Sequence, residues 1–265
     1  MSEKMIDELV ELLRSSRKCL AFTGAGVSTL SGIPDFRGPN GVFSQKFQSW
    51  TVEQLHDIRV FRSHPEAFYQ YARSSWYLLD TLKPNIVHLV LAELEAAGLL
   101  KAVYTQNIDM LHQKADSKRV EEIHGTLETH SCLDCSKKFG FAEIKKTVMT
   151  GEVPRCDQCS GLIKPDVIFF GEMLDQNLLE RGRKDFSEAD LVLVLGSSLT
   201  VQPAASLPLL AIKNHSRKSE IGTPIEEIVK DADVIDFYQY GFGFSREEQK
   251  IRYEKMLDQN GRLIL

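Results

Sequence analysis

The apolar residues of this chain fall into short continuous runs and into longer stretches with helical spacing. Three continuous runs predict buried strands at residues 18–23, 101–105 and 191–196. The last run reads Leu-Val-Leu-Val-Leu-Gly, and an uninterrupted apolar run is typical of a strand buried on both faces of a parallel sheet. A fourth run, at residues 167–170, predicts one more short strand.

Two stretches place an apolar residue at every third or fourth position, which predicts helices at residues 5–16 and 85–99. Gly98 is expected to end the second helix. We expect His88, which lies within that helix, to be a packed or capping histidine rather than a ligand. The apolar positions that set the spacing are Met5, Leu9, Leu12, Leu13, Ile86, Leu89, Val90 and Leu94.

Strands that alternate with helices predict an α/β fold, a doubly wound parallel, Rossmann-like sheet with a nucleotide crevice at the carboxyl ends of its strands. Two segments interrupt this pattern. Residues 38–84 are rich in aromatic residues and predict a helical insertion with its own small core. Residues 129–163 are polar and lysine-rich and hold four cysteines, which predicts a small separate module. The remainder, 1–37, 85–128 and 164–265, is expected to form the nucleotide-binding domain.

The composition places the chain among ordinary globular proteins. Of its 265 residues, 43% are hydrophobic and 26% are charged. The net charge of −5 gives no attraction to nucleic acid or to an anionic membrane, so neither is expected as a partner. No apolar stretch approaches the roughly 20 residues that span a bilayer, and residues 1–7 lack the apolar core of a signal peptide. We therefore expect a cytoplasmic protein.

Four of the five cysteines form two Cys-x-x-Cys pairs, Cys132 with Cys135 and Cys156 with Cys159, separated by 20 residues. This spacing predicts a small zinc-binding module of the ribbon type. Four thiolates fill a tetrahedral ion and leave no open position, so the predicted zinc is structural. A redox-active dithiol and free thiols are the alternatives. The fifth, Cys19, is expected to be a small core residue.

The first predicted strand runs into a glycine turn, Gly24-Ala25-Gly26. Glycines directly after a strand let the backbone approach a pyrophosphate, and a helix beginning there points free N–H groups at the phosphates. The spacing lacks the third glycine of the full dinucleotide fingerprint, so the turn alone is also consistent with an ordinary tight turn. A second turn of small residues follows the strand at 191–196. It is consistent with a second nucleotide contact and also with a plain strand-to-helix connection.

Five motifs follow one another along the chain, and their combination is far more specific than any one of them. They are the glycine turn with Pro34-Asp35-Phe36-Arg37, then Thr105-Gln106-Asn107-Ile108-Asp109, Glu122-Ile123-His124-Gly125-Thr126, the two cysteine pairs, and Gly196-Ser197-Ser198. In this order they closely resemble the sirtuin family of NAD-dependent protein deacylases, in particular the deacetylases of bacteria and archaea. The resemblance extends over roughly residues 6–212.

The resemblance implies an NAD-dependent protein-lysine deacetylase, which transfers the acetyl group of acetyl-lysine to ADP-ribose and releases nicotinamide. It implies that His124 is the catalytic base, and that Asn107 and Asp109 are catalytic residues that fix the ribose and the carboxamide. NAD is then a consumed co-substrate, and one zinc ion is structural. The implied NAD-binding residues are Gly24, Ala25, Gly26, Thr29, Ile33, Asp35, Phe36, Arg37, Gln106, Asn107, Ile108, Asp109, His124, Gly196, Ser197 and Ser198.

The resemblance also implies a protein or peptide partner that carries acetyl-lysine and binds as an added β-strand. The implied substrate-binding residues are Val167, Ile168, Phe169, Phe170 and Gly171. Family members that prefer negatively charged acyl groups carry Tyr-x-x-Arg in the helical insertion. Here Tyr69 is followed at that spacing by Ala72, and Arg73 comes one position late, which points it elsewhere on a helix. A deacetylase is therefore expected rather than a desuccinylase.

The end of the chain departs from the family pattern. From Asn214 to Gly222 there is one apolar residue, so the strand expected there is not apparent, and no adenosine contact beyond residue 212 is assigned. Two other functions stay open at this point. One is a mono-ADP-ribosyltransferase that uses the same activated sugar carbon. The other is a non-enzymatic module that binds NAD or acyl-lysine, with an adenosine pocket damaged by the altered end.

Overall fold

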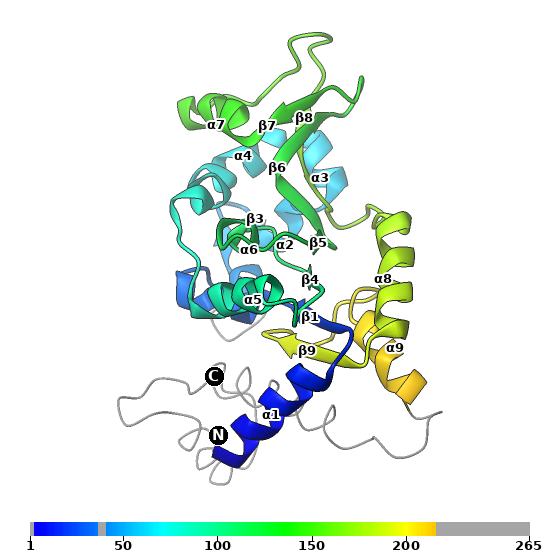
Figure 1. Ribbon diagram of the computed structural model, residues 1–265. Coiled ribbons are helices and arrows are strands. Elements are labelled where there is room, and N and C mark those ends of the chain that lie inside the picture. The colour runs from blue at the N-terminus through cyan, green and yellow to red at the C-terminus, as the bar shows by residue number, and fades with distance from the viewer. Residues whose placement is uncertain (1–2, 37–40, 216–265) are drawn as a thin grey trace.

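The computed structural model describes residues 3–36 and 41–215 of the chain (Figure 1). Its centre is a parallel sheet of four strands in the order β5-β4-β1-β9. These are β1 Cys19–Thr23, β4 Ala102–Thr105, β5 Val120–Glu122 and β9 Leu191–Leu195. Thr23 at the end of β1 pairs with Thr105 of β4 on one side and with Leu195 of β9 on the other. The strands at 18–23, 101–105 and 191–196 are thus confirmed.

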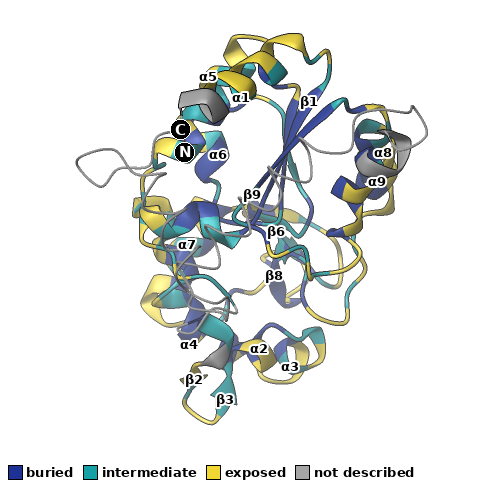
Figure 2. Ribbon diagram, turned by 90° about the horizontal axis from the view of Figure 1, so that it is seen from below, coloured by how far each residue is buried: buried dark blue, intermediate teal, exposed yellow. Residues whose placement is uncertain are grey.

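Helices cover both faces of this sheet, as Figure 2 shows on either side of β1. Cys19 and Ala21 face the layer of α1 (Glu3–Ser15) and α5 (Ile86–Ala96). Leu20 and Phe22 face the opposite layer, α8 (Gln176–Glu188) and α9 (Ser206–His215). Successive residues of a strand point to opposite faces, so this alternation makes the sheet doubly wound. The predicted fold class is therefore confirmed.

Both predicted helices are present, and their ends have local causes. The Asn85 side chain accepts a hydrogen bond from the Val87 N–H at 2.9 Å and so begins α5. The buried His88 Nδ1 accepts from the Asn85 N–H at 3.3 Å, so His88 is the packed and capping histidine that was expected. Gly98, with φ +75°, lies just beyond the end of α5. Among the described residues, no helix has both the length and the apolar character needed to cross a membrane.

The other elements lie in the two interrupting segments and in short connections. The residues before α5 form η1 Ala25–Ser31, η2 Val42–Ser44, β2 Lys46–Phe47, β3 Trp50–Thr51, α2 Val52–Leu55, α3 Ile58–Ser63, α4 Pro65–Arg73 and η3 Trp76–Thr81. After β4 come α6 Leu111–Lys114 and then β6 Gly125–Cys132, β7 Lys138–Gly140, α7 Phe141–Thr150 and β8 Ile163–Val167. β2 and β3 form a small hairpin, and β7-β6-β8 form an antiparallel sheet that stands above the parallel one in Figure 1.

The aromatic insertion does not have a core of its own, contrary to the expectation from the sequence. Phe61, Phe68 and Tyr77 of the insertion belong to one buried cluster with Ile144 and Val148 of α7. The two segments are also linked by a hydrogen bond from the Tyr69 hydroxyl to the Ile163 carbonyl, at 2.6 Å. We call this joint unit, residues 41–82 with 125–170, the small lobe. The boundaries proposed for the segments, at 38–84 and 129–163, stay a prediction.

The prediction of a strand at residues 167–170 is wrong. The strand in this region, β8, runs from Ile163 to Val167 and ends at the first residue of the predicted one. Beyond Val167 the backbone N–H groups of Ile168 and Phe170 donate to the carbonyls of His124 and His56, not to one neighbouring strand. The apolar run has another cause. Phe169 is 2% exposed and lies in the core of the small lobe, so its apolar character reflects burial rather than strand pairing.

Candidate functional site

A cavity of about 990 Å³ lies at the carboxyl ends of the parallel strands, between the sheet and the small lobe. Each of the four parallel strands leads into a segment that lines it, as expected for a doubly wound sheet. The small lobe contributes aromatic side chains and the segment after β8. The lining residues used below are Gly24, Ala25, Gly26, Asp35, Phe36, Phe43, His56, Trp76, Gln106, Asn107, Ile108, His124, Val167, Ile168, Phe169, Phe170, Gly171, Glu172, Met173, Gly196, Ser197, Ser198 and Thr200.

The two glycine turns are in direct backbone contact. The Gly26 N–H donates to the Gly196 carbonyl at 2.9 Å. A Cβ at Gly24 would lie 2.5 Å from the Gly196 oxygen, and a Cβ at Gly196 would lie 2.3 Å from the Val27 nitrogen. No side chain can occupy either position without moving the backbone. The segment after the first turn is the 3₁₀-helix η1 (Ala25–Ser31), so the expected helix opening is a tight helical turn.

Behind this turn, a buried polar cluster joins β4 to η1. Ser28, 1% exposed, donates to Asp109 Oδ2 at 2.6 Å, and the Leu111 N–H donates to Asp109 Oδ1 at 2.9 Å. The Asn107 side-chain amide donates to the Gly24 carbonyl at 3.0 Å and to Ser28 Oγ at 3.1 Å. Asn107 reaches the cavity, whereas Asp109 lies behind its wall. The carboxylate thus holds the turn that carries the glycines.

His124 stands two residues beyond β5, at the point where the chain enters the small lobe. Its Nδ1 lies 3.1 Å from the Gln106 carbonyl oxygen, which can only accept a hydrogen bond. Nδ1 therefore carries the ring proton, and Nε2 is the nitrogen left to take up a proton. The next residue, Gly125, has φ +79°, and a Cβ there would lie 2.1 Å from the Asp166 oxygen, so β6 and β8 approach each other closely beside the histidine.

Aromatic rings form the wall of the cavity on the side of the small lobe. The rings of Phe36 and Phe43 are 5.0 Å apart, and Phe43 is 5.8 Å from Phe170 and from His56. His56 is in turn 4.9 Å from Trp76. These separations are those of aromatic pairs in contact. The wall is therefore continuous from the nucleotide side, at Phe36, into the small lobe.

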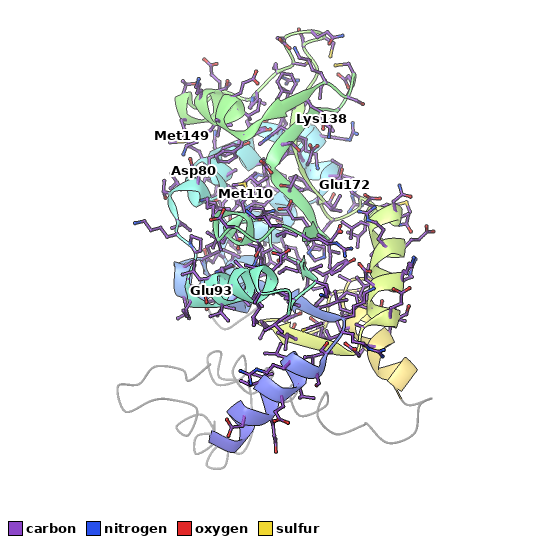
Figure 3. The ribbon with its side chains drawn as sticks, viewed as in Figure 1. Asp80, Glu93, Met110, Lys138, Met149 and Glu172 are labelled. Atoms are coloured by element: carbon purple, nitrogen blue, oxygen red, sulfur yellow. The ribbon has the colours of Figure 1, made fainter. Side chains whose placement is uncertain are left out.

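An ion pair between a buried lysine and a partly buried glutamate holds the segment after β8. Lys164, 5% exposed, pairs with Glu172 at 2.9 Å and donates to the Val167 carbonyl at 2.6 Å. Burial lowers the pKa of Lys164, and the contact with Glu172 opposes this shift. Glu172, labelled in Figure 3, also accepts from the Phe169 N–H at 2.7 Å. The backbone N–H groups of residues 168–170 are thus all bonded within the protein.

Two residues considered for acyl preference lie away from the cavity. The Tyr69 hydroxyl donates to the Ile163 carbonyl inside the small lobe. The Arg73 guanidinium lies against Gly151, where an added Cβ would be 2.7 Å from its nitrogen. Neither residue lines the cavity. The described residues therefore offer no Tyr–Arg pair to an acidic acyl group.

The structure brings most of the residues singled out from the sequence to one cavity. Thr29, Ile33 and Asp109 do not line it: the Thr29 hydroxyl donates to the Gly26 carbonyl at 2.9 Å, and the Ile33 N–H donates to the Ser28 carbonyl at 3.3 Å. Arg37 lies outside the described residues, as does the chain end after residue 215. Sequence reasoning missed Ser28, Phe43, His56, Trp76 and Thr200.

The four paired cysteines converge at the tip of the small lobe. Their Sγ atoms all lie within 4.8 Å of one another, with Cys132 and Cys159 3.4 Å apart and Cys135 and Cys156 3.6 Å apart. Thiolates on one tetrahedral zinc ion, at about 2.3 Å from it, are about 3.8 Å apart. The four side chains therefore fit a single zinc ion. Cys19 is fully buried in the core of the parallel sheet, and burial raises the pKa of its thiol to about 12.

The fold and the cavity define a nucleotide-binding protein of the doubly wound class that carries a four-cysteine metal module. The sequence profile of the Sir2 family matches residues 24–203, and the chain belongs to that family. The NAD-dependent protein deacetylase of Thermotoga maritima is 44% identical over 236 residues, which cover 87% of this chain and 94% of that protein. NAD-dependent protein deacylase 2 of Archaeoglobus fulgidus is 42% identical over 214 residues, 80% of this chain and 82% of that protein.

Solved structures give the same result. A structure described as Sir2–p53 peptide–NAD+ has a TM-score of 0.72 and 40% identity, and the match covers 90% of this chain and 99% of that one. Another, described as the structural basis of sirtuin substrate affinity, has a TM-score of 0.73 and 46% identity and covers 81% of this chain and 84% of that one. The similarity to sirtuins that the motifs indicated is thereby confirmed.

Proposed function

We infer that the protein is an NAD-dependent protein-lysine deacetylase. The curated relatives in T. maritima and A. fulgidus are named NAD-dependent protein deacetylase and deacylase, and a similar solved structure holds a p53 peptide and NAD+. The observation that carries the inference is the single cavity that joins a glycine turn, Asn107 and His124 to the segment after β8. One side suits a dinucleotide and the other suits a peptide.

NAD would lie along the two glycine turns. Gly24, Gly26 and Gly196 all line the cavity, and the absence of side chains at these positions would let phosphates approach the backbone. Ser197 and Ser198 line the same side, and Gln106 is fixed by donating to Ser197 Oγ at 2.7 Å. Asn107 and Ile108 would surround the nicotinamide end, with Phe36 shielding the reactive sugar carbon from water. Asp109 would act from behind, by holding Ser28 and the turn.

The reaction transfers the acetyl group without any change of oxidation state. The acetyl oxygen of the substrate bonds to the C1′ carbon of the nicotinamide ribose, and nicotinamide leaves with the electron pair of its glycosidic bond. A ribose hydroxyl then loses its proton to His124 and attacks the acetyl carbon. Water completes the exchange, so that lysine leaves as the free amine and the acetyl group remains as an ester of ADP-ribose.

His124 suits the role of the base because its tautomer is fixed. The Gln106 carbonyl engages Nδ1–H at 3.1 Å, which directs proton uptake to Nε2. The histidine also lies at the junction of the two halves of the cavity. Its main-chain carbonyl accepts from the Ile168 N–H at 2.8 Å, so the base and the substrate-binding segment are held together.

The peptide would bind at the rim of the segment 167–171, and not along its whole length. Strand addition needs free backbone groups on the receiving strand. Since the N–H groups of residues 168–170 are already bonded, this part forms the wall of the acyl-lysine tunnel. The Glu172 N–H is bonded as well, to the Phe169 carbonyl at 3.0 Å, so the peptide backbone would pair beyond this part through Gly171 and Met173. The segment near Thr200, which also lines the cavity, would lie on the other side of the peptide. Met173, 78% exposed, marks this rim.

Zinc would have a structural role, since four protein thiolates leave no position for substrate. It would hold together the tip of the small lobe. We also propose a cytoplasmic location, because metal-binding cysteines escape oxidation to disulfides in a reducing compartment.

The experiment that tests the function measures nicotinamide release from NAD with an acetyl-lysine peptide, with the same peptide unacetylated, and with no peptide. Release that depends on acetylation, together with free lysine and acetyl-ADP-ribose, supports the deacetylase. Transfer of label from NAD to protein without deacetylation would instead support a mono-ADP-ribosyltransferase. Folded, zinc-loaded protein with no release would support a binding module.

A further inference from the structure

Within the wall of the cavity, one buried polar atom has no partner among the described residues. His56 is 6% exposed and lines the cavity together with Phe43, Trp76 and Phe169. Its Nδ1 lies 2.5 Å from the Val52 carbonyl, whereas its Nε2 is buried without a hydrogen bond. Leaving a buried nitrogen unpaired costs about 1–3 kcal/mol, so such an atom calls for an explanation.

The protonation state of this ring follows from its contacts. The Val52 carbonyl oxygen can only accept, so Nδ1 carries the proton and Nε2 carries the lone pair. Burial among aromatic rings also lowers the pKa of His56 to about 4, so the ring is neutral near pH 7. The unpaired atom is therefore a hydrogen-bond acceptor. A donor would satisfy it, while a carboxylate would not.

The backbone places His56 close to the reacting centre. The Ile168 N–H donates to the His124 carbonyl, and the Phe170 N–H donates to the His56 carbonyl, both at 2.8 Å. Ile168 and Phe170 are two residues apart, and two residues of chain span at most about 7 Å. The main chains of the two histidines are therefore bonded to neighbouring points on one short segment. The rings of Phe36, Phe43 and His56 follow one another at 5.0 and 5.8 Å on the same wall. An acyl group whose carbonyl reacts beside His124 would thus extend toward His56.

We propose that His56 is a specificity-determining residue, and that its Nε2 accepts a hydrogen bond from the hydroxyl of a short hydroxyacyl-lysine such as 3-hydroxybutyryl-lysine. This proposal rests on the proposed deacylase function and deepens it. The hydroxyl takes no part in bond making. The acyl group is transferred to ADP-ribose as described above, and the added hydrogen bond favours the substrate whose third acyl carbon carries a donor.

The test compares peptides of one sequence that carry acetyl-, butyryl- or 3-hydroxybutyryl-lysine, with both enantiomers of the last. The decisive quantity is the ratio of kcat/KM for 3-hydroxybutyryl to that for butyryl, because the two chains have the same carbon skeleton. His56→Phe keeps an aromatic ring and removes the acceptor. His56→Gln keeps an acceptor oxygen. His64→Phe is the matched control, since His64 lies outside the cavity.

The wild-type protein is expected to favour one hydroxybutyryl enantiomer over butyryl. His56→Phe should lower that ratio about three- to tenfold, as expected for the loss of one buried hydrogen bond, while it keeps or improves debutyrylation. His56→Gln should retain part of the preference, and His64→Phe all of it. Equal ratios in the wild type and His56→Phe, with both melting normally, would overturn the proposal.

Failure of the proposal and failure of the function remain distinguishable. If the acetyl peptide itself releases no nicotinamide, the deacetylase assignment is wrong. If the acetyl peptide reacts and the ratio does not depend on residue 56, the deacetylase stands and His56 is only a packing residue.

Discussion

The Nδ1 atom of His124 lies 3.1 Å from the carbonyl oxygen of Gln106, the first residue of the loop that follows β4. The contact joins the ends of two neighbouring parallel strands and fixes which ring nitrogen can accept a proton. The same loop carries Asn107 and, behind the wall, Asp109. The base and the nucleotide-binding groups are therefore held by one shared loop.

His124→Ala should lower kcat for deacetylation by at least about 100-fold, because a positioned general base contributes about 10²–10⁴-fold. Its melting temperature should stay close to that of the wild type, since the side chain is only partly buried. His64→Ala, at an exposed histidine outside the cavity, is the control and should retain full activity. A His124→Ala rate within a few fold of the wild type would show that another group is the base.

Asp109→Asn should impair the use of NAD more than the binding of peptide. The substitution replaces one of the two oxygens that accept from Ser28 and from the Leu111 N–H, so one of these hydrogen bonds is lost. We expect about a tenfold fall in kcat/KM for NAD and an unchanged Kd for an acetylated peptide. Asp116→Asn changes an aspartate that is exposed at the surface and is the matched control. Equal losses for both ligands would contradict the role of Asp109 behind the nicotinamide end.

Cys132→Ser should remove the zinc ion and lower the melting temperature. Loss of one thiolate leaves three ligands, and zinc binding contributes directly to the stability of the module that it holds. Because the module shares its core with the insertion, we also expect weaker peptide binding. Cys19→Ala removes a thiol that is not in the cluster, and one zinc ion per chain should remain. Full zinc content in Cys132→Ser would exclude the four-thiolate site.

Glu122→Gln should change the pH dependence of stability. Burial raises the pKa of Glu122 to about 7, and its Oε1 has no partner among the described side chains and backbone. In the folded state this group keeps a proton that the unfolded chain releases above about pH 4.5, so its contribution falls as the pH rises from about 4.5 to about 7. The variant should equal the wild type at pH 4 and exceed it by roughly 3 kcal/mol at pH 8.

Urea unfolding at several pH values measures this difference, and Glu53→Gln, at an exposed position, is the control. Buried histidines such as His112, whose pKa is lowered to about 3, chiefly by burial, act in the opposite direction. They act equally in both proteins, so the difference between them isolates Glu122. A difference that does not vary with pH would mean that Glu122 is ionised at pH 8 without cost.

The parallel sheet, the metal ligands and the motifs at the strand ends could be predicted because each depends on local patterns. The run at 191–196 is buried on both faces, and Cys-x-x-Cys spacing is a property of the ligand geometry itself. The end of β8 could not be predicted, because Phe169 is apolar for a tertiary reason, its burial in the small lobe. His56 was missed for the same cause: its environment is built by Phe43, Trp76 and Phe169, which are distant in sequence.

The shared core of the small lobe determines which pieces of this protein can be exchanged. The chain enters the lobe before the sheet is complete, leaves it to form α5 and β4, and then returns to build the cysteine module. A chimera that took residues 129–163 from a relative would place foreign side chains against Phe61, Phe68 and Tyr77. A graft meant to transfer substrate preference therefore has to carry both passages of the chain together, although more than 40 residues separate them.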